Sequence, residues 1–260
     1  MYRLKRMTIA GIFIFLSLFA LDAQAHYMWL NVNDYTPVEN HTANFSIGWG
    51  HAFYSPVMDV LYGKEMLGKI YMIGPDAKEI KVNALNEFQY ASAAKLSQGT
   101  YIAMVHRKEG FSTKTTHGYV HKPRSGLKDV IYSRYLGMYG KTIINVGAPT
   151  ESKSFMQPVG IPLEIVPMVN PSHLKTGDYF RFKLLYQGKP LTENINASYA
   201  GFSYDNAWAY TTRTKQGGIG EIKILSSGIW VIKANHKAPY PEPDKADEYS
   251  YTTSLTFEVR

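Results

Sequence analysis

Eight histidines carry the side chains of this chain that are best suited to chemistry, and one of them has a special position. They are His26, His41, His51, His106, His117, His121, His173 and His236. Ala23, Gln24 and Ala25 form a small-x-small motif typical of signal-peptide cleavage. Cleavage after Ala25 makes His26 the first residue of the mature chain, so that its α-amine and its imidazole can bind one metal ion together. Both nitrogens must be unprotonated for this, and both approach that condition near neutral pH.

The segment before His26 has the three parts of a secretory signal. Arg3, Lys5 and Arg6 form a basic start, and residues 7–21 form an apolar stretch before the cleavage motif. This stretch is shorter than the roughly 20 residues that cross a bilayer as a helix, and no second stretch approaches that length. We therefore predict a signal peptide over residues 1–25, export of the chain, and a mature chain without a membrane span.

Composition excludes several classes of site. The chain has no cysteine, which rules out thiolate zinc sites, disulfide exchange and cysteine nucleophiles. A metal would be held by nitrogen or oxygen, with methionine sulfur as a softer ligand. The formal net charge is +7, but the basic residues are scattered and form no run typical of a nucleic-acid-binding arm, so no nucleic-acid partner is expected. The sequence also lacks a P-loop, a dinucleotide fingerprint and a G-x-S-x-G nucleophile elbow.

The hydrophobic pattern predicts an all-β protein. Short alternating or aromatic-rich runs are separated by turn signals such as Gly74-Pro75-Asp76. The runs before residue 147 are 27–32, 43–49, 69–73, 79–82, 100–106 and 141–146. Those after residue 158 are 161–166, 179–186, 195–200, 209–214, 221–225, 229–235 and 249–259. The spacing of these strands is typical of antiparallel sandwiches.

Two tandem β-sandwich-like domains follow from this pattern, an N-terminal β domain over 26–147 and a C-terminal β-sandwich over 159–260. The polar residues between them, which include prolines, are typical of a linker. Residues 107–140 show no sustained period and are too long for an ordinary connection, so we expect a long irregular excursion there that is functional, mobile or partly helical.

Four further histidines lie where a ligand could be aimed at a metal. His51 follows Gly48-Trp49-Gly50, whose glycines permit a close backbone approach. His236 ends a strand and precedes the acidic loop 238–247, which could add oxygen ligands. His117 and His121 are four residues apart within the excursion, although Gly118 and Pro123 disfavour a helix there. Each also has a plain interpretation as a solvated loop or strand-end residue, and for His41, His106 and His173 we expect surface or structural roles.

Several motifs along the mature chain resemble those of one bacterial exported family. His26-Tyr27-Met28-Trp29-Leu30 resembles its A-H-x-x-W-L opening, and Gly50-His51-Ala52-Phe53 resembles its G-H-x-F element. The remaining matches are Ile161 to Pro167 with Asn170-Pro171 (G-x-P-L-E-I-x-P), Gly188 to Leu191 (G-K-P-L), Gly228 to Ile232 leading to His236, and the closing block Tyr251 to Val259. Members of the family are labelled as a domain of unknown function or as the periplasmic component of ABC-type cobalt/nickel transport systems.

The resemblance implies a β-rich periplasmic protein that binds a divalent metal, usually nickel or cobalt, as an accessory to uptake by a membrane transporter. Carried over by motif, the metal ligands are His26, His51 and His236, while His117 and His121 lie where no family motif aligns. Imidazole also suits copper and zinc, and copper should bind most tightly in vitro.

Two other classes of function remain open from the sequence. The 20 tyrosines and four tryptophans could serve a metal-free glycan- or protein-binding module. A mature N-terminal histidine with a second histidine is also the copper grip of oxidative polysaccharide-cleaving enzymes. Metal uptake by the processed protein separates the binding protein from the metal-free module, and oxidised glycan products would favour the enzyme.

Overall fold

The computed structural model describes residues 26–54, 64–148, 150, 152–205 and 207–260. The predicted signal peptide, residues 1–25, lies outside the described residues. Within the described ranges the chain is built of strands, with 3-10 turns at Lys64–Met66, Ser154–Met156, Pro171–His173 and Gln216–Gly218. None of the helices in these ranges has the length and apolar character needed to cross a membrane. The prediction of an all-β fold is confirmed.

The strands form three sheets, which we name by position. The N-terminal sheet contains β1 (Tyr27–Val32), β2 (Asn44–Gly50), β6 (Gln89–Ser92) and β5 (Val82–Ala84). The C-terminal sheet contains β10 (Leu163–Pro167), β11 (Tyr179–Tyr186), β12 (Lys189–Pro190) and β15 (Ile219–Lys223). The nine-stranded central sheet contains β3 (Leu67–Ile73), β4 (Glu79–Ile80), β7 (Gly99–Thr115), β8 (Gly118–Val120), β9 (Val130–Val146), β13 (Asn194–Tyr199), β14 (Tyr210–Arg213), β16 (Gly228–Pro239) and β17 (Glu248–Val259).

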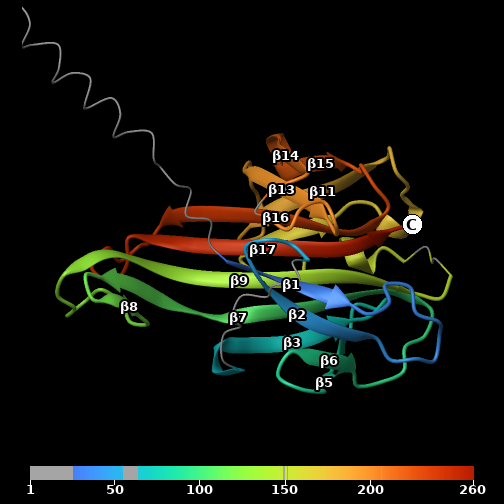
Figure 1. Ribbon diagram of the computed structural model, residues 1–260, viewed down its shortest axis with the longest axis horizontal. Coiled ribbons are helices and arrows are strands. Elements are labelled where there is room, and N and C mark those ends of the chain that lie inside the picture. The colour runs from blue at the N-terminus through green and yellow to red at the C-terminus, as the bar shows by residue number, and fades with distance from the viewer. Residues whose placement is uncertain (1–25, 55–63, 149, 151, 206) are drawn as a thin grey trace, which may run out of the picture.

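The central sheet runs through both predicted halves of the chain because β9 and β17 pair in parallel. In Figure 1 the long strands β7, β9, β16 and β17 lie side by side along the length of the molecule. The N-terminal sheet packs on one face of this sheet, and the hydroxyls of Ser254 and Thr256 on β17 donate to the backbone carbonyls of Met28 and Leu30 on β1. The C-terminal sheet packs on the opposite face.

Alternation along β16 separates the two cores. Val231 packs with Tyr27 and Trp29 of β1, whereas Trp230, Ile232 and Ala234 belong to the core beneath the C-terminal sheet. Because successive side chains of a strand point to opposite faces, a residue on β16 can serve one core or the other but not both. The even-numbered residues of β16, which include His236, therefore point toward the C-terminal sheet.

The expectation of a long irregular excursion over 107–140 is wrong. β7 continues to Thr115 and β9 begins at Val130, so that residues 116–129 alone, which include β8, connect them. The register shifts between Arg107 and Gly110, and such a bulge disrupts the alternation that marks a strand in a sequence. Polar residues inside this hairpin are also buried in pairs, since Thr113 Oγ1 and Ser133 Oγ lie 2.6 Å apart.

One lysine is buried in the core that contains Tyr27. Lys233 is 3% exposed, and its Nζ lies 4.6 Å from the centre of the Tyr27 ring and 5.3 Å from that of the Trp208 ring. Burial lowers the pKa of Lys233 to about 8, because the protonated amine has lost its water. The two rings recover part of that loss through cation–π contacts.

Lys233→Met is predicted to remove part of the pH dependence of stability. An unfolded lysine has a pKa of about 10.4, so the unfolded state binds more protons than the folded state between about pH 8 and pH 10.4, and the free energy of unfolding rises with pH there. From about pH 7 to pH 9.5 this group contributes a rise of about 2 kcal/mol. Urea denaturation at both pH values should show a smaller rise in the variant than in the wild type.

The exposed Lys223 provides the matched control. Lys223→Met should keep the wild-type rise in stability. An equal rise in Lys233→Met and wild type would contradict the assignment of the pKa shift to burial.

Candidate metal centre

The pairing of β1 with β2 brings two of the predicted ligands together. The antiparallel register places Tyr27 opposite Gly50 and Met28 opposite Trp49, and one step further along this register lie His26 and His51. Their imidazole centroids are 3.9 Å apart, with an angle of 42° between the rings. Both residues are half-buried. The structure therefore places side by side the predicted mature terminus and the histidine that follows β2.

Trp49 supports this pair and was missed as a functional residue in the sequence. Its ring stacks on that of His26, with centroids 5.5 Å apart and an angle of 10°. The sequence held a signal for this contact in the Gly48-Trp49-Gly50-His51 segment. Residues 49 and 51 of an extended strand point to the same face, so Trp49 could have been expected beside the His51 site.

Gly48 allows β1 and β2 to approach in this register. It lies opposite Trp29, and a Cβ at Gly48 would stand 2.2 Å from Trp29 Cε2. The Trp29 ring in turn packs against Tyr27 and Phe53. The glycine is thus required by the aromatic packing that holds β1, and with it His26, against β2.

His236 lies apart from this pair, on the other face of the central sheet. Its Nδ1 is 3.1 Å from Glu193 Oε2, and its ring centroid is 4.5 Å from that of Tyr186 at the end of β11. His236 has the parity of Ile232 and Ala234, which face the core beneath the C-terminal sheet. The structure therefore does not bring His236 to His26 and His51.

His117 and His121 lie at the far end of the β7–β9 hairpin. Both are exposed, and His117 Nε2 is 4.0 Å from Asp129 Oδ2 with 84% of the histidine side chain accessible. They flank β8 rather than lying on one helix face. Neither residue adjoins the pair formed by His26 and His51.

A family model described as "Domain of unknown function (DUF4198)" matches residues 23–238. The chain belongs to this DUF4198 family. The match begins just before His26 and contains every histidine singled out above as a metal ligand. A comparison with curated proteins finds no match.

Three solved structures that match this DUF4198 chain do so at low identity and low TM-score. The D0-D1 domain of intimin is 6% identical, with 90% of this chain and 100% of that chain covered and a TM-score of 0.24. The fibronectin(III)-like modules of Clostridium thermocellum CbhA are 9% identical over 88% and 94% of the two chains, with a TM-score of 0.20. The Yersinia pseudotuberculosis adhesin InvE is 11% identical over 89% and 59%, with a TM-score of 0.22. Such scores carry no argument about function.

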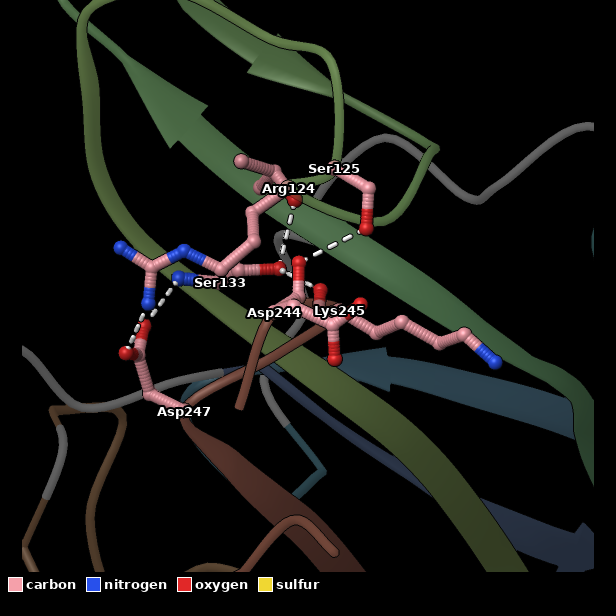
Figure 2. Close-up of polar contacts among 7 residues, drawn as sticks. Arg124, Ser125, Ser133, Asp244, Lys245 and Asp247 are labelled. Carbon is pink, nitrogen blue, oxygen red and sulfur yellow. Dashed lines mark hydrogen bonds and ion pairs between the residues drawn. The ribbon is translucent and has the colours of Figure 1, made fainter. Parts of the chain in front are cut away.

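The acidic loop after β16 is engaged elsewhere in this DUF4198 chain. Figure 2 shows Asp247 paired with Arg124 of the hairpin end, and the second carboxylate oxygen of Asp247 accepts the Ser133 backbone N–H at 2.7 Å. Ser125 Oγ donates to the Asp244 carbonyl at 2.7 Å. The Asp247 carboxylate and the Asp244 carbonyl therefore fasten the loop to the β7–β9 hairpin.

His236→Ala is predicted to leave metal affinity unchanged within about two-fold, because His236 lies across the sheet from His26. It should lower the free energy of unfolding by about 1 kcal/mol, since Glu193 loses a hydrogen-bond partner. Metal titration and urea denaturation of the same preparation measure the two effects. A tenfold or greater loss of metal affinity would instead place His236 at the site.

The donor set at His26 and His51 fits a borderline transition metal. Among the described residues no three His, Cys, Asp or Glu side chains form a group that could hold an ion, so a third protein ligand would have to come from another kind of group. The predicted cleavage before His26 would supply one, the α-amine. Two imidazoles and an amine form an all-nitrogen set, which suits nickel, cobalt, copper and zinc and disfavours calcium and magnesium.

Proposed function

We propose that the mature protein is a periplasmic binding protein for a divalent transition metal of the nickel or cobalt type. The ion is held by the α-amine and imidazole of His26 together with the imidazole of His51. The observation that carries this proposal is the 3.9 Å separation of the two imidazole centroids at the predicted chain terminus. From this separation, rotation of the two side chains would direct one nitrogen of each ring to a shared ion at about 2.0–2.1 Å.

Processing acts as a switch for this site. Before cleavage the nitrogen of His26 belongs to a peptide bond and is a poor ligand, so the export precursor offers two imidazoles alone. After cleavage the amine and the ring of the same residue bind one ion as a chelate, which holds the metal more strongly than separate groups do. The proposal thereby links metal binding to the compartment that the signal peptide predicts.

The identity of the physiological metal follows from supply more than from affinity. The affinity of nitrogen ligands for divalent ions rises from cobalt to nickel to copper and is lower for zinc than for copper. Copper is therefore expected to bind most tightly in vitro, whichever ion is bound in the cell. The resemblance of the motifs to a cobalt/nickel uptake component favours nickel or cobalt and a membrane transporter as the recipient of the ion.

Isothermal titration of the processed protein with Ni²⁺, Co²⁺, Cu²⁺ and Zn²⁺ tests the proposal. We expect one ion per chain and the tightest binding for Cu²⁺. The double variant His26→Ala/His51→Ala should bind none of the four specifically. Absence of stoichiometric binding of all four ions to the wild type would overturn the proposal.

A further inference from the structure

A polar pocket lies on the central sheet away from His26 and His51. It has a volume of about 430 Å³ and lies between β3, β7, β9 and residues 159–162. Its chemically distinctive lining residues are Lys69, Tyr71, Glu79, His106, Glu109 and Tyr139. None of them has a part in the proposed metal centre.

The wall formed by β7 and β9 is fixed by hydrogen bonds. Tyr139 donates its hydroxyl to Glu109 Oε1 at 2.5 Å, and burial together with this carboxylate raises the pKa of Tyr139, so the phenol stays protonated. His106 Nε2 accepts the Lys69 backbone N–H at 2.8 Å, which places the proton of the neutral ring on Nδ1. Tyr139 therefore stays a hydrogen-bond donor to Glu109.

On the opposite wall of the pocket, charged side chains lie beside an aromatic ring. Lys69 forms an ion pair with Glu79, and its Nζ lies 4.6 Å from the centre of the Tyr71 ring. Two carboxylates and one ammonium give this pocket a local formal charge of −1. Donors and acceptors thus surround the pocket, with ring faces between them.

Aromatic side chains continue from this pocket along the same face of the sheet. We name Tyr139, Tyr251, Tyr249, Tyr135, Tyr240 and Phe111 the aromatic row. Successive ring centroids are 6.3 Å (Tyr139–Tyr251), 5.6 Å (Tyr251–Tyr249) and 4.8 Å (Tyr249–Tyr240) apart. Tyr135 and Phe111 lie beside these rings, 5.1 Å from each other. Tyr139 and Tyr251, nearest the pocket, are 3% and 4% exposed, whereas the other four members of the row are half-buried.

This combination selects a neutral, polyhydroxylated ligand. The carboxylates of Glu79 and Glu109 repel an anion, and the polar walls would leave unsatisfied groups against an apolar ligand. Sugar hydroxyls both donate and accept, as the walls do, and the apolar faces of sugar rings pack on aromatic side chains.

We propose that this pocket binds one sugar unit of a neutral oligosaccharide whose further units extend toward the half-buried rings of Tyr249, Tyr240 and Tyr135. Glu109 and Glu79 accept hydrogen bonds from sugar hydroxyls, and the half-buried Tyr71 provides ring surface. This binding is independent of the metal, so it survives chelation of the protein.

Titration calorimetry of the chelator-treated protein with soluble hexasaccharides of glucose, N-acetylglucosamine and mannose tests this proposal. We expect a dissociation constant below about 1 mM for at least one of them, and a loss of at least about five-fold in affinity for Glu109→Gln and for Tyr71→Ala. Glu87→Gln, an exposed change on the N-terminal sheet side, is the matched control and should bind as the wild type does.

Far-ultraviolet circular dichroism and thermal denaturation confirm that each variant is folded. The proposal is overturned if none of the three sugars binds at about 10 mM, or if both pocket variants bind as tightly as Glu87→Gln. The variant His26→Ala/His51→Ala should keep sugar binding, so a failure of the metal proposal and a failure of this one are distinguishable.

Discussion

Glu164→Gln is expected to lower the free energy of unfolding by about 3–5 kcal/mol, because it leaves a buried ammonium without its counter-charge. Lys141 on β9 and Glu164 on β10 are each 1% exposed, and Lys141 Nζ lies 2.7 Å from Glu164 Oε1. Burial lowers the pKa of Lys141, and the Glu164 carboxylate opposes that change. The glutamate also accepts the backbone N–H groups of Val159 and Gly160 at 2.8 and 3.0 Å. One carboxylate thus anchors the segment that joins the two halves of the chain.

Urea denaturation at neutral pH measures this effect. Glu221→Gln, an exposed change on β15, should alter stability by less than about 0.5 kcal/mol. The double variant Lys141→Met/Glu164→Gln should recover most of the loss, since it removes the unpaired ammonium and keeps an amide oxygen as acceptor for the backbone N–H groups of Val159 and Gly160. A Glu164→Gln protein as stable as Glu221→Gln would show that the pair does not hold the two halves together.

His51→Ala is expected to weaken binding of Cu²⁺ and Ni²⁺ by at least about 100-fold, or about 2.7 kcal/mol. The variant removes one of the two imidazoles and leaves the amine and ring of His26 as a two-nitrogen chelate. It should also change the spectroscopic signature of bound Cu²⁺, because the ion then takes water in place of a nitrogen. Competition titration against a chelator of known affinity gives the change in affinity.

His41→Ala is the matched control for this variant. His41 is exposed, and its Nδ1 lies 3.0 Å from the backbone carbonyl oxygen of Glu39. Its loss should therefore leave the Cu²⁺ affinity and the spectrum of bound Cu²⁺ as in the wild type. If His51→Ala and His41→Ala bind Cu²⁺ equally, His51 is not a ligand.

The strands of the fold could be predicted from the sequence because most of them alternate visibly. The β7–β9 hairpin could not, since its bulge interrupts the alternation and its polar residues form buried pairs such as Thr113 with Ser133. The parallel pairing of β9 with β17 could not be predicted from the sequence either. It joins segments more than a hundred residues apart, and no local pattern encodes such a pairing.

The pairing of His26 with His51 could be predicted as a motif but not as a contact. Residues 33–43 separate β1 from β2, and a connection of that length leaves the register open. A shift of one residue would turn His51 to the other face of the N-terminal sheet. The same rule explains His236, whose strand was predicted correctly but whose parity places it beneath the C-terminal sheet with Tyr186.

The central claim is that the chain terminus itself is a metal ligand, and one added residue tests it most directly. The mature protein beginning at His26 and the same protein with a single glycine before His26 differ at the α-amine and keep both imidazoles. The first should bind Cu²⁺ at one ion per chain, and the second should bind it at least about tenfold more weakly, a loss of about 1.4 kcal/mol. Equal affinity of the two proteins for Cu²⁺ would contradict a ligand role for the terminus.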